Sequence, residues 1–155
     1  MNITVLYGTE TGNTEMLAED LTAHLEGEHD VACSNLSDFD PADFSPDRLY
    51  LVLCSTYGDG ELPGSARPFA EALAAKAPDL SAIRVAVFGL GDSEYAETHN
   101  FGSRVLLDLL KARGAVEVGE RMIHDASGPD MASDVAMPWA DDMVARAAVR
   151  LGEAV

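Results

Sequence analysis

The sequence is poor in positive charge. It holds only ten Lys and Arg residues against 27 Asp and Glu residues, which gives a formal net charge of −17. Binding to nucleic acid or to an anionic membrane surface requires basic patches, so we expect neither kind of partner. Two explanations of the acidity stay open. It steers the protein toward a basic partner protein, or it reflects a highly solvated surface in a saline environment.

Cysteine is scarce and long apolar runs are absent. The two cysteines, Cys33 and Cys54, lack CxxC spacing and cannot frame a disulfide-stabilised fold. Both lie in apolar, strand-like runs, so we expect two buried thiols. No apolar run approaches the roughly 18 residues of a membrane span, and no basic segment precedes the first strand as in a signal peptide. These features predict a cytoplasmic protein.

Residue patterns typical of metal centres and hydrolases are also missing. None of the four histidines has metal-ligand spacing to a cysteine or to a second histidine. Ser, His and Asp are scattered, and no nucleophile elbow is present. We expect His24 and His29 to be solvated and His124 to be a surface residue near the ligand-free end of the sheet. The sequence therefore predicts no metal site and no catalytic residue.

The 155 residues alternate between short apolar runs and amphipathic stretches, which predicts one domain spanning residues 1–155. The predicted strands are Asn2–Tyr7, Asp30–Ser34, Leu49–Ser55, Val85–Gly89 and Glu117–Ile123. The third and fourth are almost continuously apolar, as in strands covered on both faces. Alternation of strands with helices predicts the α/β class, with a doubly wound, five-stranded parallel sheet and helices on both faces.

Helical spacing of apolar residues defines four helices between and after these strands. The buried faces are predicted to include Leu17, Leu21 and Leu25 in the first helix, Phe69, Ala70 and Leu73 in the second, Val105, Leu106, Leu109 and Leu110 in the third, and Trp139, Met143, Val144, Ala147 and Leu151 in the last. Gly114 is predicted to end the third helix. Trp139 is expected at the start of the last helix and in the core.

Three Gly-rich, polar segments follow the first, third and fourth predicted strands. The first loop is Tyr7-Gly8-Thr9-Glu10-Thr11-Gly12-Asn13-Thr14, the second is Ser55-Thr56-Tyr57-Gly58-Asp59-Gly60-Glu61-Leu62-Pro63-Gly64-Ser65-Ala66, and the third is Gly89-Leu90-Gly91-Asp92-Ser93-Glu94-Tyr95. In a parallel sheet, ligands bind outside the carboxyl ends of the strands. We therefore expect the three loops to share one edge and one ligand.

The first loop has the composition of an uncharged phosphate site. It lies at a strand-to-helix turn and offers three hydroxyls, two glycines and an Asn, without Lys or Arg. Backbone amides at a helix start, helped by hydroxyls, hold a phosphate without a cation. Gly8 and Gly12 are too close for a Walker A loop, and no GxGxxG pattern is present. A monophosphate is favoured, and a Ser/Thr-rich helix cap is the alternative.

The second and third loops each deliver a tyrosine after a Gly-rich exit from a strand. Tyr57 and Tyr95 can enclose a flat ring by stacking, each contact contributing about 1 kcal/mol beyond the area it buries. The alternative for either tyrosine alone is a loop anchor. Together the three loops predict a ligand that combines a phosphate with a planar ring.

These segments resemble the flavodoxin superfamily. The pattern Thr9-x-Thr11-Gly12-x-Thr14 is similar to its FMN phosphate loop. The segments Ser55-Thr56-Tyr57-Gly58-Asp59-Gly60 and Phe88-Gly89-Leu90-Gly91-Asp92-Ser93-x-Tyr95 are similar to its two isoalloxazine loops. The second loop and Pro78-Asp79-Leu80-Ser81 are most similar to MioC-type proteins and to the FMN domains of diflavin reductases. The last predicted strand is not split by an insertion, and in this respect the chain is similar to the short-chain type of the family.

The resemblance implies a strand order of 2-1-3-4-5 and FMN as the cofactor. It implies that FMN is bound by Thr9, Glu10, Thr11, Gly12, Asn13, Thr14, Ser55, Thr56, Tyr57, Gly58, Asp59, Gly60, Gly91, Asp92 and Tyr95. Tyr57 and Tyr95 would flank the ring. One departure is His99, which stands where diflavin domains often have Asn and receives no role.

The function implied is electron transfer. The chain would carry single electrons between a flavodoxin or ferredoxin reductase and an acceptor enzyme. It would act as a monomer and bind to basic patches on these partner proteins. Since nothing in the chain binds NAD(P)H or a substrate, we expect a carrier and not an enzyme. Two alternatives are an FMN-dependent quinone or azo reductase on the same fold and a flavin-free signalling module.

Overall fold

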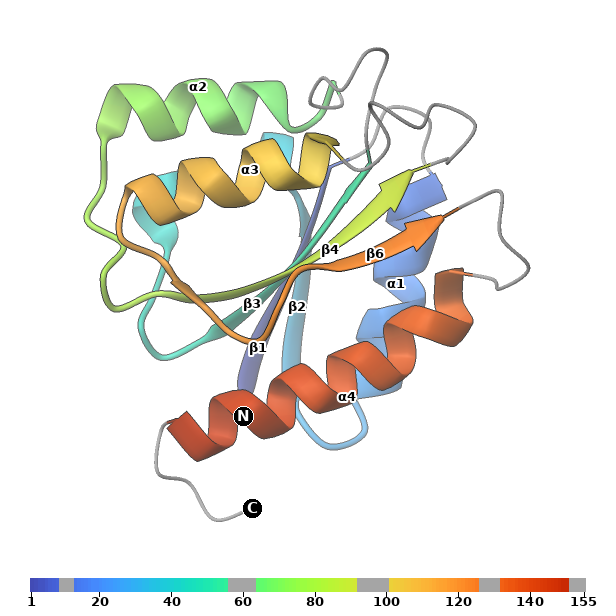
Figure 1. The fold of residues 1–155 in the computed structure, drawn as a ribbon. Coiled ribbons are helices and arrows are strands. Elements are labelled where there is room, and N and C mark those ends of the chain that lie inside the picture. Colours follow the sequence, from blue (N-terminus) through green and yellow to red (C-terminus); the bar gives the residue numbers. More distant parts are fainter. Residues whose placement is uncertain (9–12, 56–63, 92–100, 126–131, 151–155) are drawn as a thin grey trace.

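The computed structural model describes residues 1–8, 13–55, 64–91, 101–125 and 132–150 (Figure 1). Its strands are β1 (Asn2–Gly8), β2 (Asp30–Asn35), β3 (Leu49–Ser55), β4 (Arg84–Gly91), β5 (Val116–Glu117) and β6 (Met122–Asp125). Its helices are α1 (Asn13–Leu25), α2 (Arg67–Lys76), α3 (Phe101–Ala112) and α4 (Ala132–Arg150), with 3-10 turns η1 (Leu36–Asp38) and η2 (Pro41–Asp43). None of these helices combines the length and the apolar character needed to cross a bilayer.

All strand pairs are parallel, in the order β2-β1-β3-β4-β5, and β6 also pairs with β4. The short strands β5 and β6 therefore follow one another along the same side of β4, so the predicted five-stranded sheet and its order are confirmed. The prediction of one continuous last strand, 117–123, was wrong. Gly119 lies between β5 and β6 with a φ of +65°, a left-handed conformation that interrupts extended backbone.

Helices cover both faces of the sheet, α1 and α4 on one side and α2 and α3 on the other (Figure 1). The strands serve both layers because successive side chains point to opposite faces. In β1, Val5 packs in the core layer of α1 and α4, whereas Leu6 packs in the layer of α2 and α3. The alternation continues through β3, all of whose residues except Ser55 are buried, as its apolar run predicted.

The predicted helix faces are confirmed for α1 and for the described residues of α4, whose remaining predicted residue, Leu151, lies outside the described residues. They are confirmed only partly for α2 and α3, in which Ala70 and Leu109 are half-buried. Leu17, Leu21 and Leu25 of α1 are all buried. In α3, Val105 is 40% exposed, contrary to the prediction, and Leu107 is buried in its place. Helical spacing allows either residue on the edge of the apolar stripe, and only packing against the sheet decides between them.

Trp139 lies in the core, as predicted, at 3% exposure. Its ring packs against Phe88 of β4 with a centroid distance of 5.3 Å. Its predicted place at the start of the last helix was wrong, because α4 begins at Ala132. Trp139 thus joins α4 to the centre of the sheet from within the helix.

The two cysteines differ in burial. Cys54 of β3 is fully buried, as predicted, but Cys33 of β2 is exposed, and that prediction was wrong. β3 is central in the sheet, whereas β2 is an edge strand with several exposed residues. An apolar-looking run in the sequence does not distinguish a central strand from an edge strand.

Candidate functional site

The carboxyl ends of β1, β3 and β4 lie at one edge of the sheet (Figure 1). β1 ends at Gly8, β3 at Ser55 and β4 at Gly91. The registers place Gly8 beside Cys54 and Ser55 beside Leu90, so the three strands end level with one another. The three predicted loops therefore leave from the same edge, where ligands of open α/β sheets bind.

Four of the predicted FMN-binding residues lie among the described residues. Asn13 is the first residue of α1, Thr14 is buried in the same turn, Ser55 ends β3 and Gly91 ends β4. The other predicted residues lie outside the described residues: Thr9, Glu10, Thr11, Gly12, Thr56, Tyr57, Gly58, Asp59, Gly60, Asp92 and Tyr95. Their roles stay predictions.

The N-terminus of α1 supplies the electrostatics of this edge. α1 begins at Asn13, five residues after the end of β1, and its first amides have no partner within the helix. Aligned peptide dipoles place a partial positive charge there, which favours an anion. The neighbouring sequence at 1–8, 13–16, 52–55 and 88–91 contains no Lys or Arg. Backbone amides and hydroxyls are therefore the donors offered by these segments.

A tyrosine at the start of the first loop and a glutamate just after it form a contact, and sequence reasoning did not assign a role to either. The Tyr7 hydroxyl of β1 donates a hydrogen bond of 2.8 Å to Oε1 of Glu15 in α1. Burial, followed by the hydrogen bond to Glu15, raises the pKa of Tyr7 to about 12. The sequence signal for this hydrogen bond is an aromatic residue at the end of a strand followed by a Glu at the third position of the next helix.

A second contact joins the strand ends. The Ser55 hydroxyl donates to the carbonyl oxygen of Gly8 at 3.4 Å. This hydrogen bond links β1 to β3 at the point where the first and second loops begin. The hydrogen bond therefore holds the starting points of these two loops together.

His124 was expected at the surface and at the opposite end of the sheet, and both expectations were wrong. It is buried, at 8% exposure, and lies one residue before the end of β6. The parallel register places it beside Leu90, at the carboxyl edge. The prediction failed because β6 extends beyond Ile123, so His124 belongs to the strand and not to a loop.

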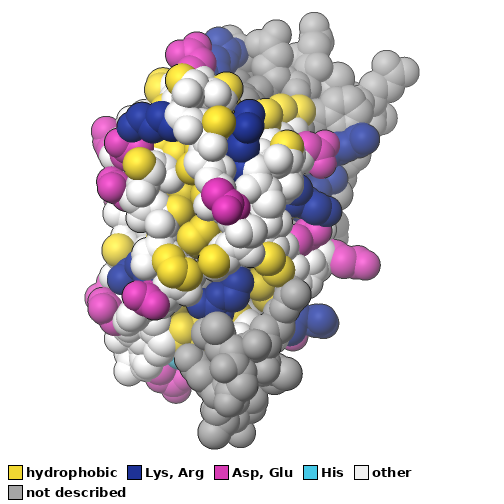
Figure 2. Space-filling view, turned by 90° about the vertical axis from the view of Figure 1, so that its left-hand side faces the viewer, with side chains coloured by type: hydrophobic (Ala, Val, Ile, Leu, Met, Phe, Trp, Pro, Cys, Tyr) yellow, Lys and Arg dark blue, Asp and Glu magenta, His cyan; other side chains and the backbone are white. Residues whose placement is uncertain are grey.

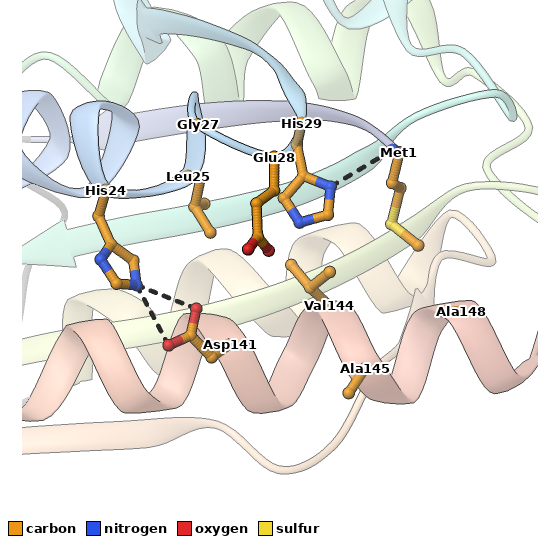
Figure 3. A pocket seen from close by; sticks show the side chains of 10 residues that line it. All are labelled: Met1, His24, Leu25, Gly27, Glu28, His29, Asp141, Val144, Ala145 and Ala148. Carbon is orange, nitrogen blue, oxygen red and sulfur yellow. Dashed lines mark hydrogen bonds and ion pairs between the residues drawn. The ribbon is translucent and has the colours of Figure 1, made fainter. Parts of the chain in front are cut away.

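At the other end of the molecule, a hollow of about 870 Å³ lies between α4 and the end of α1 with the turn that follows it (Figure 3). His24 is exposed, as expected, whereas His29 is half-buried, and each has a partner there. His24 Nε2 lies 3.0 Å from the Asp141 carboxylate, and His29 Nδ1 lies 3.3 Å from the amino group of Met1. In the described part of the chain no group of three or more His, Cys, Asp or Glu residues is arranged to hold a metal ion.

Comparison with known proteins gives one consistent result. The model of the flavodoxin family matches residues 5–139. The protein MioC of Escherichia coli O157:H7 is 35% identical over 138 residues, which cover 89% of this chain and 92% of that protein. The NADPH-dependent diflavin oxidoreductase 1 of Schizosaccharomyces pombe is 33% identical over 151 residues, 95% of this chain and 26% of that protein.

Solved structures agree with this result. A variant of flavodoxin from Pseudomonas aeruginosa superposes with a TM-score of 0.81 at 26% identity, covering 94% of this chain and 98% of that one. Flavodoxin 2 from Bacillus cereus superposes with a TM-score of 0.79 at 26% identity, with coverage of 94% and 99%. The family model covers most of the chain, and the observed strand order is the one that the resemblance to flavodoxins implied. The chain therefore belongs to the flavodoxin family.

Proposed function

We propose that this protein binds FMN at the carboxyl edge of its sheet and carries single electrons between a reductase and an acceptor protein. The observation that carries the proposal is the N-terminus of α1 placed beside the level ends of β1, β3 and β4 in a member of the flavodoxin family. Bound FMN supplies the redox chemistry, and the protein binds it, orients it and sets its electrostatic surroundings.

The donor set at this edge fits a phosphate monoester. The first amides of α1 and the buried hydroxyl-bearing Thr14 provide hydrogen-bond donors without a cation. In the proposal, residues Thr9–Thr14 hold the phosphate. Residues Ser55–Gly60, together with Gly91, Asp92 and Tyr95, bind the ring, with Tyr57 and Tyr95 flanking it.

Carboxylates in the second and third loops would make electron addition difficult. These loops carry Asp59, Glu61, Asp92 and Glu94, and residues 55–66 and 89–95 contain no Lys or Arg. Negative charges held near the ring disfavour any further negative charge there. We therefore propose that the fully reduced cofactor forms only at low potential, which suits a carrier that donates electrons.

The proposed partners are proteins with basic docking surfaces. A net charge of −17 attracts such surfaces and speeds their encounter with this chain. The side of the molecule where α2 and α3 end presents basic, acidic and hydrophobic side chains interspersed (Figure 2). That face is not uniformly acidic. The second and third loops carry four carboxylates and no Lys or Arg, so the carboxyl edge from which they leave is the better candidate for docking. We further propose that residues 1–155 act as one FMN-binding domain, monomeric and cytoplasmic.

A fluorescence titration of FMN with the flavin-free protein tests cofactor binding. Stacking of the ring quenches flavin fluorescence, so quenching is expected to saturate at one FMN per chain. Stepwise reduction of the complex, followed by visible absorption, is expected to show two separate one-electron steps. Absence of quenching would refute the proposed function.

The carrier role is tested with NAD(P)H and a quinone. Without a reductase, the FMN-loaded protein is expected to leave NAD(P)H unoxidised. Addition of a flavodoxin reductase is expected to start electron transfer from NAD(P)H to the FMN-loaded protein. Fast quinone turnover by the protein alone would instead identify a quinone reductase. The two results separate the carrier from its enzymatic alternative.

A further inference from the structure

Tyr7 and Glu15 lie, in the sequence, on either side of the predicted phosphate-binding residues 9–14. Tyr7 is the last residue but one of β1, and Glu15 is the third residue of α1. The Tyr7 hydroxyl donates to Oε1 of Glu15 at 2.8 Å, a hydrogen bond to a carboxylate. The pair thus connects the strand that enters this segment with the helix that leaves it.

Tyr7 is a fixed donor. Its ring is 8% exposed and belongs to the core cluster that includes Leu17 and Leu21 of α1. Its backbone pairs with Asn35 of β2 and with Leu53 of β3. Glu15, in contrast, is exposed, and its side chain has several rotatable bonds. The position of the tyrosine hydroxyl therefore determines where the carboxylate rests.

Glu15 is a potential competitor of a bound phosphate. A Glu at the third position of a helix is the residue of the capping box, whose carboxylate turns back to the backbone amide of the N-cap residue. That amide is one of the unpaired donors at the helix start, which a phosphate at α1 needs. A carboxylate in that place would also repel a dianion. The other titratable side chains that act electrostatically on Tyr7 are Cys33 and Glu19, and the Glu19 carboxylate has no donor to offer Glu15.

We propose that Tyr7 is a positioning residue for the cofactor phosphate: it holds the Glu15 carboxylate away from the first amides of α1 and so keeps them available. The inference rests on the proposed function, because it concerns the phosphate of FMN. It predicts that Tyr7 affects binding of the phosphate and not of the flavin ring. It also predicts that the effect of removing the hydroxyl depends on Glu15.

The test compares two ligands, FMN and riboflavin, which differ by the phosphate. Tyr7→Phe is expected to weaken FMN binding about tenfold, the effect of losing one hydrogen bond to a charged group, and to leave riboflavin binding unchanged. Tyr7→Phe combined with Glu15→Ala is expected to restore FMN affinity to nearly the wild-type value. Glu15→Ala alone is expected not to weaken FMN binding. Calorimetry with inorganic phosphate and the flavin-free protein is expected to rank the variants in the same order.

Tyr50→Phe is the matched control. Tyr50 is a second buried tyrosine, at the opposite end of the sheet, and its hydroxyl accepts a hydrogen bond of 2.7 Å from the Ser45 amide. This variant is expected to lower stability without changing the ratio of FMN to riboflavin affinity. The control separates the loss of any buried hydroxyl from the specific effect on the phosphate.

Two results would overturn the inference while leaving the proposed function standing. One is an unchanged ratio of FMN to riboflavin affinity in Tyr7→Phe, whether both affinities fall equally or neither falls, and the other is no recovery in the double variant. A wild-type protein that binds no FMN would overturn the proposed function, and this inference with it.

Discussion

At the scale of single residues, burial decides chemical behaviour that residue type alone does not. Cys33 and Cys54 both lie in apolar runs, yet one thiol is exposed on β2 and the other is enclosed in β3. Burial raises the pKa of the Cys54 thiol to about 12 and also raises that of Cys33. Only the thiolate is reactive, so both raised pKa values suppress reaction at neutral pH.

We expect one thiol to react in the folded protein and the second only after unfolding. Cys33 is accessible, and its reaction with a thiol reagent is expected to become faster as the pH rises and the thiolate forms. Cys54 is protected by complete burial. Counting modified thiols with and without denaturant, across a pH series, checks this. Cys33→Ser should abolish the reaction of the folded protein, and equal rates for both thiols in the folded protein would contradict the expectation.

At the scale of elements, the end of α3 depends on a conformation that glycine adopts at low cost. Gly114 follows α3, as the sequence predicted, with a φ of +99°. A Cβ at this position would lie 3.2 Å from the backbone nitrogen of Ser81. Both the left-handed backbone and the close neighbour exclude a side chain here.

Gly114→Ala is therefore expected to lower the free energy of unfolding by about 1–3 kcal/mol, since it adds backbone strain to a steric contact. Urea unfolding followed by circular dichroism measures the change. Gly27→Ala is the matched control, because a Cβ at Gly27 would meet nothing within 4 Å. That variant is expected to change stability by less than about 1 kcal/mol. An equal loss in both variants would contradict the argument from Gly114.

At the scale of the whole molecule, net charge sets both self-repulsion and encounter with partners. The value of −17 on 155 residues destabilises the compact state through repulsion among carboxylates. The described ion pairs, such as Lys76 with Asp40 at 2.6 Å, are largely exposed and contribute little on their own. Salt therefore acts on this protein mainly through screening.

Raising the ionic strength from about 0.01 M to about 0.15 M is expected to stabilise the fold and to slow electron transfer with a basic partner. The first effect follows from screened self-repulsion and the second from screened attraction between the partners. Urea unfolding and stopped-flow reduction by a flavodoxin reductase measure the two effects in the same buffers. A partner reaction that does not depend on salt would contradict electrostatic docking.

The sequence by itself determined the sheet and the edge from which the three predicted loops leave. Alternating apolar runs and helical faces are local patterns, so the order of the helices and main strands and the end of α3 before Gly114 could be predicted from the sequence. The family's loop motifs could also be recognised, because phosphate and ring binding depend on short contiguous segments. Tyr7 and Glu15 were present in the same stretch of sequence, but their hydrogen bond depends on how α1 packs against β1.

Only the tertiary structure decided which side chains are covered. Cys33 is exposed because β2 is at the edge, Val105 because α3 turns another side chain toward the sheet, and His124 is buried because β6 extends past Ile123. Each of these outcomes depends on contacts between segments far apart in the chain. Apolar periodicity indicates which residues favour burial, and the packing of the elements determines which of them are buried.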